Sequence, residues 1–271
     1  MILRGIAHAH SRWSYDGCHH LAEIAAFAEA QGLDFVLMSE HNRTLDDDAM
    51  AAFVGACDAL TRTTSVVMVP GIECEATPDY VHVLGYGVRT LVRDRTVGTI
   101  AAGIHRACGV AVLAHPVYKD ALGHLSRAAL DGLDGFEIWN GKADGGAYPS
   151  DAAIRHLAEL RRTGSTLFPM AGADLHRLEA YPGITLEVSC GAREGAAILA
   201  ALGRRAYRVR GRAWVFAATD PLREPPRTPR RLVAAAALHM RRRAQRLHAW
   251  LVRRGMQAPA PIAHAARRIM K

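Results

Sequence analysis

Seven short apolar runs are spaced along the first 170 residues, and segments with helical periodicity lie between most of them. The runs predict β-strands at residues 3–7, 35–38, 65–69, 81–85, 110–113, 135–138 and 167–170. The intervening pattern predicts helices at residues 21–30, 47–60, 97–107, 122–130, 151–162 and 194–202. Glycine follows four of these helices, at Gly32, Gly109, Gly132 and Gly164, and a strand begins soon after each. This repeated order predicts an α/β fold with parallel strands.

Side chains that can bind metal ions stand at or just beyond the C-terminal ends of these strands. The candidates are His8, His10, Asp16, His41, Glu73, His82, His115, Asp174 and His176. Because side chains alternate along an extended chain, we expect His8 and His10 to share one face of the first strand. Ligands from six strands must face one centre, which favours a closed barrel over an open sheet.

The donor types narrow the choice of metal. Imidazole and carboxylate together suit zinc, manganese or iron, and the candidates include no cysteine of a closed structural zinc site. Six histidines and three carboxylates are too many for one ion, so we expect two or three divalent ions. Glu73 is the best candidate for a bridging ligand, since Gly71 lets the backbone approach closely.

Composition is consistent with a globular protein that has a buried core, because 50% of the 271 residues are apolar. The five cysteines are odd in number and include no C-x-x-C pair, which indicates reduced thiols. No stretch approaches the ~18 uninterrupted apolar residues of a membrane span. We therefore expect a cytoplasmic protein without a transmembrane segment.

The net charge of +8 is concentrated in the C-terminal part. Residues 220–271 contain 13 lysines and arginines and two acidic residues, whereas residues 1–219 contain 21 basic and 24 acidic residues. We expect a hydrolase domain at residues 1–219, followed by a basic Pro/Arg-rich link and an amphipathic helical tail at residues 220–271. Three interpretations of the tail stay open: a helix docked on the domain, a helix on an anionic membrane, and a nucleic-acid contact.

The motifs around these residues resemble those of the PHP (polymerase and histidinol phosphatase) superfamily of metal-dependent phosphoesterases, over residues 2–207. Six motifs carry the resemblance, H-x-H with S-x-D-G, E-H-N, G-x-E, H-x-L-G-Y, A-H-P and G-x-D-x-H, which begin at His8, Glu40, Gly71, His82, Ala114 and Gly172. Glu40 stands where the family most often has aspartate, and we expect a carboxylate there to orient His41.

The resemblance implies a distorted seven-stranded (β/α)7 barrel with metals at its C-terminal rim, to which this chain adds a basic C-terminal helical extension. It implies one metal at His8, His10, Glu73 and Asp174, a second at Asp16, His41 and His176, and a third at Glu73, His82 and His115.

These observations predict a metal-dependent phosphoesterase in which a metal-bridging hydroxide attacks a small phosphomonoester, such as a nucleotide or a sugar or amino-alcohol phosphate. Asp174 or His176 would handle the leaving-group proton. The predicted phosphate-binding cations are Arg12, Arg177, Arg43 and Lys119. Two alternatives stay open: a phosphodiesterase or exonuclease on short nucleic acids, and a non-catalytic metal-bound module that acts through its basic tail.

Overall fold

The computed structural model describes residues 1–77, 81–117 and 125–253, and the chain forms two compact units, Met1–Glu224 and Pro225–Lys271. The strands are β1 (Ile2–Ala9), β2 (Phe35–Met38), β3 (Glu40–His41), β4 (Val67–Val69), β5 (Gly71–Ala76), β6 (Val81–Tyr86), β7 (Val110–Ala114), β8 (Gly135–Asn140), β9 (Phe168–Gly172), β10 (Thr185–Ser189), β11 (Tyr207–Arg210) and β12 (Val215–Ala217). The helices are α1 (Leu21–Ala30), α2 (Asp47–Thr63), α3 (Val97–Arg106), α4 (Arg127–Asp131), α5 (Gly141–Asp144), α6 (Asp151–Arg162), α7 (Gly195–Gly203) and α8 (Pro229–Arg253), with 3-10 turns η1 (Asn42–Thr44) and η3 (Leu178–Ala180).

Local sequence signals explain where several helices begin. Asp46, Thr96 and Ser150 each accept a hydrogen bond from a backbone N–H in the first turn of α2, α3 and α6. The predicted helix at 122–130 starts later than expected, because Ser126 caps the first turn of α4. Residues 122–124 of that prediction lie outside the described residues.

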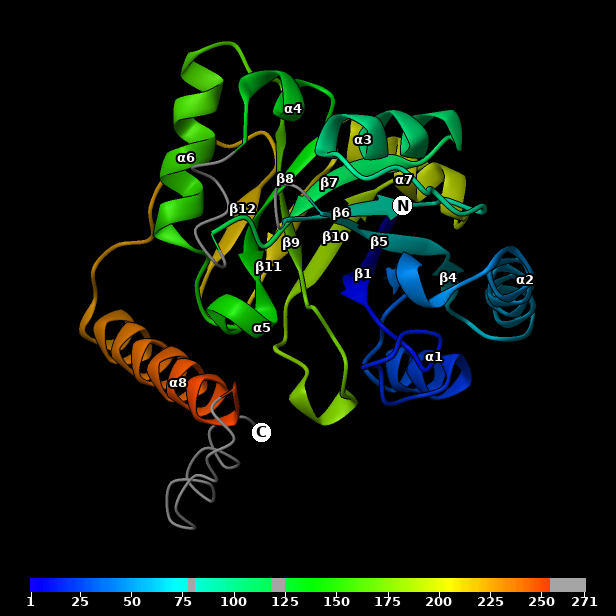
Figure 1. Ribbon diagram of the computed structural model, residues 1–271, viewed down its shortest axis with the longest axis horizontal. Helices are drawn as coiled ribbons and strands as arrows, with labels where there is room; N and C mark the ends of the chain where they lie inside the picture. Colours follow the sequence, from blue (N-terminus) through cyan, green and yellow to red (C-terminus); the bar gives the residue numbers. More distant parts are fainter. Residues whose placement is uncertain (78–80, 118–124, 254–271) are drawn as a thin grey trace. The chain divides into compact units, whose positions relative to one another are not determined.

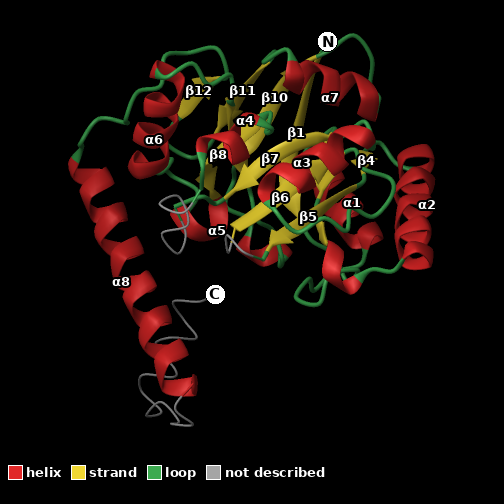
Figure 2. Ribbon diagram, turned by 45° about the horizontal axis from the view of Figure 1, so that its top comes forward, coloured by secondary structure: helices red, strands yellow, loops and turns green. Residues whose placement is uncertain are grey.

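The strands of the first unit form two mixed six-stranded sheets, ordered β12-β11-β10-β1-β2-β4 and β3-β5-β6-β7-β8-β9. The chain passes from the first sheet to the second at Ser39, between β2 and β3, and again at Pro70, between β4 and β5. In both views of the molecule the strands lie between α2 and α6 (Figures 1 and 2).

The prediction of an α/β fold is confirmed, but the prediction of a wholly parallel sheet is wrong. β1 pairs with β10, β5 with β6, and β6 with β7 in antiparallel orientation. Four residues separate β5 from β6, which is too short for the crossover that a parallel pair needs. The closed seven-stranded barrel is not confirmed either. The described strands form two sheets, and backbone hydrogen bonds from Ala173 to Ala7 and from Leu175 to His8 join β1 to the segment after β9.

Two hydrophobic clusters hold these layers together. The larger cluster packs the strands against the helices, with Ile24 of α1, Phe53 of α2 and Ile104 of α3 fully buried. The second contains strand residues from both sheets, among them Leu37 and Tyr86. Both clusters consist of apolar side chains, so the buried charged groups described below are exceptions that need an explanation. Among the described residues, no helix has the length and apolar content needed to cross a membrane.

Candidate metal centre

A β-bulge in β1 brings His8 and His10 to the same centre. The register between β1 and β2 shifts between Ala7 and Ala9, which inserts His8 as an extra residue. Ile6 and Ala9 therefore both belong to the helix-covered cluster, and the two imidazole centroids lie 5.2 Å apart. The prediction assumed that side chains alternate regularly along β1, which does not hold here. Ile6 packs against the helices, so regular alternation would have turned His8 and His10 towards the helices as well.

Three of the candidate residues have a backbone conformation that side chains disfavour. His8, His115 and Asp174 have φ angles of 62°, 29° and 51°, in the left-handed region. Each such residue costs about 1–3 kcal/mol and persists only where its surroundings fix it. All three lie in the cluster of acidic and imidazole side chains, which is where backbone strain is expected at a functional site.

Glu73 of β5 lies at the centre of the cluster and is 2% exposed. Its Oε2 is 3.4 Å from His8 Nε2, 3.3 Å from His10 Nε2 and 3.5 Å from His41 Nδ1. Its Oε1 is 2.6 Å from His82 Nδ1 and 3.1 Å from His115 Nε2. One buried carboxylate is thus surrounded by five imidazoles. Gly71 lets the start of β5 pack closely against the backbone of the neighbouring strands, since a Cβ there would overlap Met38 O and lie 2.7 Å from Gly85 O.

A second part of the cluster forms around Asp16. His176 Nε2 is 2.9 Å from Asp16 Oδ2, and His41 Nε2 is 3.4 Å from Asp16 Oδ1. The ring of His10 stacks on both imidazoles, at 4.2 Å from His176 and 4.7 Å from His41. Asp174 closes the other side, with its Oδ1 3.2 Å from His176 Nδ1 and 3.9 Å from His10 Nε2.

Among the described residues, three groups have donor atoms close enough to share an ion. They are His10, Asp16, His41 and His176; His8, Glu73 and His115; and His8, His10 and Asp174. The structure therefore brings together all nine predicted ligands, and His82 joins them through its contact with Glu73. The groups differ from the sets implied by the resemblance in three respects. The group of His8, His10 and Asp174 lacks Glu73, His10 also joins the Asp16 group, and His8 takes the place of His82 beside Glu73 and His115.

Buried side-chain atoms that lack hydrogen-bond partners indicate that this cluster fits metal ions. Five buried side-chain nitrogens and oxygens in the described part of the chain have no hydrogen-bond partner, and three of them are His8 Nε2, His10 Nε2 and Asp16 Oδ1. Buried polar atoms are normally paired, so three together require an explanation. Imidazole nitrogens and a carboxylate oxygen are the ligands that zinc, manganese and iron accept. The structure therefore supports divalent metal binding here.

Glu137 of β8 is a functional residue that sequence reasoning missed. Its Oε1 is 3.0 Å from His8 Nδ1, and its Oε2 accepts hydrogen bonds from the backbone N–H of His115 and from Asn140 Nδ2. A carboxylate beside Nδ1 keeps a proton on that nitrogen, so Nε2 is the nitrogen that gives up its proton to bind a metal. The available signal was an acidic residue inside an otherwise apolar strand. Gly172 makes room for it, because a Cβ there would overlap Glu137 Oε1.

Glu40 acts on the cluster indirectly. Its carboxylate accepts hydrogen bonds from the backbone N–H and hydroxyl of Ser11 and from the Ser14 hydroxyl. Ser14 Oγ in turn accepts from the backbone N–H of His41 and lies 3.4 Å from His10 Nδ1. The expectation that Glu40 orients His41 therefore needs a correction: Glu40 fixes Ser14, and Ser14 positions the His41 backbone and the His10 ring.

The electrostatics of the cluster favour ionised carboxylates. Burial alone would raise the pKa of Glu73, but the charge of His8 and the imidazole hydrogen bonds hold that pKa well below its usual range. The same competition lowers the pKa of Asp16, where the interactions of its carboxylate with His176 and His41 outweigh burial. Both side chains are thus negatively charged at neutral pH, as metal ligands must be.

The predicted phosphate-binding cations differ in their placement. Arg43 lies over the Tyr15 ring, with Cζ 4.4 Å from its centroid, and pairs with Glu75 at 3.3 Å. Arg12 is held within its own loop, donating to Cys18 O and lying 2.9 Å from His20 Nε2.

Arg177 is exposed and directly follows His176, while Lys119 lies outside the described residues. Lys142 of α5 also lies beside the cluster, with its Nζ 3.3 Å from His176 Nε2 and 3.8 Å from Asp174 Oδ1.

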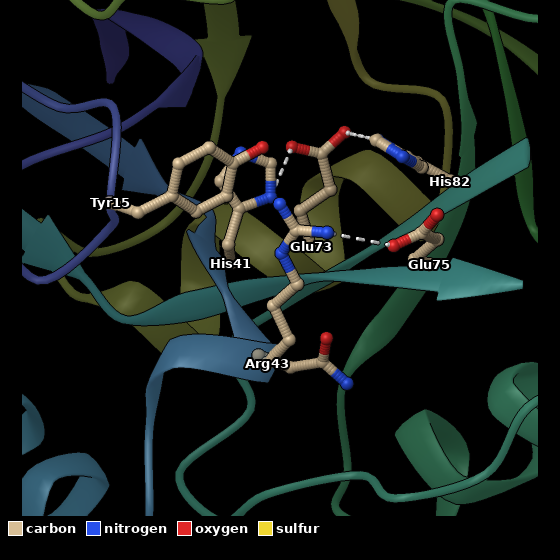
Figure 3. Close-up of a pocket in the computed structure, with 7 residues that line it drawn as sticks. Tyr15, His41, Arg43, Glu73, Glu75 and His82 are labelled. Atoms are coloured by element: carbon tan, nitrogen blue, oxygen red, sulfur yellow. Dashed lines mark hydrogen bonds and ion pairs between the residues drawn. The ribbon is translucent and has the colours of Figure 1, made fainter.

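A cavity of about 220 Å³ opens beside the cluster. It is lined by Tyr15, His41, Asn42, Arg43, Glu73, Glu75 and His82 (Figure 3). The carboxylate of Glu73 lies between the imidazoles of His41 and His82, and Arg43 extends in front of it (Figure 3). The cavity thus joins one face of the cluster to a guanidinium at its wall.

Comparison with known proteins supports the fold. The structure is similar to a two-domain protein from Bacteroides vulgatus ATCC 8482 that contains a predicted PHP-like metal-dependent phosphoesterase, with a TM-score of 0.57 and 16% identity over 78% of this chain. This chain spans 65% of that protein's length. The chain has a PHP-like fold. The resemblance read from the motifs is thereby confirmed at the level of the fold.

PsfC from Pseudomonas syringae PB-5123 is also similar, with a TM-score of 0.52 and 14% identity over 90% of this chain and 99% of that chain. The lesion-specific endonuclease PfuEndoQ from Pyrococcus furiosus matches with a TM-score of 0.49 and 13% identity over 76% of this chain and 56% of that chain. No protein-family model matches the sequence, and no curated protein matches it.

Proposed function

We propose that this protein is a metal-dependent phosphoesterase that hydrolyses small phosphomonoesters. The observation that carries the proposal is the environment of Glu73, a buried carboxylate surrounded by five imidazoles, next to buried nitrogens of His8 and His10 that lack hydrogen-bond partners. A structural salt bridge does not need five histidines around one acid. Two or three divalent ions need several nitrogen and oxygen ligands close together, which this arrangement supplies.

The ligand sets follow the groups in the structure. Since each imidazole has one nitrogen available for one ion, we assign one ion to His8, His10 and Asp174, one to Asp16, His41 and His176, and one to Glu73, His82 and His115, with Glu73 as the central carboxylate. When bound, divalent ions lower the pKa of water to about 7 and neutralise charge that develops on phosphate oxygens. This mixture of nitrogen and oxygen ligands suits zinc, manganese and iron, and elemental analysis identifies which of them the protein binds.

The chain's own residues then hold the ester and move the proton. Arg43 at the cavity wall and Lys142 beside His176 supply positive charge for the phosphate oxygens, and the predicted roles of Arg12, Arg177 and Lys119 stay predictions. Asp174 and His176, whose side chains lie 3.2 Å apart, are the proposed groups for the leaving-group proton.

Chromogenic phosphomonoester and phosphodiester substrates, assayed with added manganese, test the proposal. We expect turnover of the monoester, loss of activity in the double variant His8→Ala/His10→Ala, and retained activity in the matched variant His105→Ala/His156→Ala, whose histidines lie on α3 and α6. Turnover of the diester alone would replace the proposal with a phosphodiesterase. A fully active His8→Ala/His10→Ala variant would refute the mechanism, and an inactive metal-loaded protein would favour the non-catalytic module.

A further inference from the structure

Helix α8 has a composition unlike that of the first unit. Its 25 residues contain seven arginines and no lysine, aspartate or glutamate. Thr228 caps the helix by accepting a hydrogen bond from the backbone N–H of Arg231, and Pro229 occupies its first turn. An alanine run at 234–237 adds strong helix formers. The sequence thus specifies a long, strongly cationic helix.

Large apolar side chains on α8 are exposed. Leu232, Val233 and Met240 are 59%, 71% and 62% exposed, and they make up three of the seven large exposed apolar residues in the described part of the chain. Val233 and Met240 are seven residues apart, which places them on one face of the helix. In the sequence, positions 247 and 251 continue this spacing with leucine. Exposed large apolar side chains on a helix this cationic indicate an interaction surface.

The charge of the helix restricts what can cover this stripe. A second copy of the chain would bring seven more arginines to the same face without any acidic residue on either helix, so like charges oppose self-association. A nucleic acid would pair with the arginines but would offer no apolar layer to the stripe. The surface of an anionic phospholipid bilayer offers both, with phosphates at the level of the arginines and acyl chains beneath.

We propose that α8 binds the surface of anionic phospholipid membranes, with Leu232, Val233 and Met240 inserted at the apolar boundary and its arginines, apart from the buried Arg231, on lipid phosphates. Arginine suits this role better than lysine, because its planar guanidinium binds a phosphate through two hydrogen bonds. The helix lies on the membrane and does not cross it. This inference is independent of the proposed hydrolase activity.

Cosedimentation of the full-length protein with vesicles tests the proposal. We expect binding to vesicles that contain phosphatidylglycerol, little binding to pure phosphatidylcholine vesicles, and weaker binding as salt is raised. The triple variant Leu232→Ser/Val233→Ser/Met240→Ser keeps every arginine and should bind the anionic vesicles at least about tenfold more weakly. The matched control Ala234→Ser/Ala235→Ser adds hydroxyl groups away from the stripe and should bind as the parent does.

Competition with a DNA duplex separates the two kinds of phosphate partner. Vesicle binding that the triple variant retains would overturn the proposal, because it would show that charge alone suffices. Tight duplex binding without vesicle binding would also overturn it and would assign α8 to nucleic acid. Circular dichroism of the triple variant checks that the helix persists, and a urea-unfolding midpoint equal to that of the parent checks that the first unit is folded.

Discussion

The carboxylate of Glu137 is predicted to set the metal affinity of His8 without touching the metal. Its Oε2 accepts two hydrogen bonds, from the backbone N–H of His115 at 2.7 Å and from Asn140 Nδ2 at 3.0 Å. In Glu137→Gln the amide oxygen must take the Oε2 position, since an NH2 group there would face two donors. The NH2 group then faces His8 Nδ1, where a carboxylate oxygen lies 3.0 Å away in the parent.

This exchange reverses the tautomer of His8. An amide donor facing Nδ1 requires a lone pair on Nδ1, so the proton moves to Nε2 and occupies the lone pair that would bind the metal. Loss of such a supporting carboxylate typically lowers metal affinity 10- to 100-fold, which corresponds to about 1.4–2.7 kcal/mol. The change in side-chain volume is negligible, so packing around this 1% exposed residue is retained.

Isothermal titration of the metal-free protein with zinc or manganese, in the presence of a competing chelator, measures the effect. The matched control is Glu75→Gln, which makes the same chemical change at a carboxylate that is 41% exposed and pairs with Arg43. We expect the Glu75→Gln variant to bind metal as the parent does. Equal metal affinity for the Glu137→Gln variant and the parent would refute the assignment of Glu137 to the support of His8.

Further predictions concern packing, substrate binding, metal removal and pH. Gly172→Ala should lower the free energy of urea unfolding by about 1–3 kcal/mol and lower the metal content, because the new methyl group overlaps Glu137 Oε1. An unchanged free energy of unfolding would show that the site has room for the methyl group. Arg43→Ala and Lys142→Ala should each raise KM for a phosphomonoester several-fold at unchanged metal content, and a change in kcat alone would argue against phosphate binding. Chelation of the metals should lower Tm by about 5–10 °C if the ions are present at about a hundredfold excess over Kd, and an unchanged Tm would show that no ion stabilises the fold. Folding lowers the pKa of Asp16, so ionised Asp16 stabilises the metal-free protein at pH values above its unfolded pKa of about 3.9. This stabilisation is lost as pH falls and the carboxylate becomes protonated. The free energy of urea unfolding should therefore depend less steeply on acid pH in Asp16→Asn than in the parent.

Much of the site could be predicted because its residues follow predicted strands. Glu73 and His115 follow strands that the apolar pattern marks, and the C-terminal ends of strands are where α/β folds gather polar side chains. His82 is the second residue of β6 and reaches the site because β6 runs antiparallel to β5 and β7. The sequence could not reveal how β1 directs its histidines inward, because a bulge depends on pairing with β2 and not on local composition.

Other features depended on partners distant in sequence. Glu137 looked like part of an apolar strand, and its role appears only when β1 brings His8 to within hydrogen-bond distance. The antiparallel pairing of β5 with β6 was not predicted, because β5 was not predicted as a strand. The short link between β5 and β6 is the feature that would have indicated this pairing. Arg12 lies next to predicted ligands in the sequence, yet its side chain is held by Cys18 and His20.

Elemental analysis of the full-length protein, after incubation with manganese, zinc and iron salts and removal of free metal, tests the central claim most directly. The convergence of nine ligands around Glu73 predicts about two to three bound ions per chain and the loss of at least one in a Glu73→Gln variant. A metal content near zero in the folded parent protein would contradict the account, because the unpaired nitrogens of His8 and His10 would then have no function that the site explains.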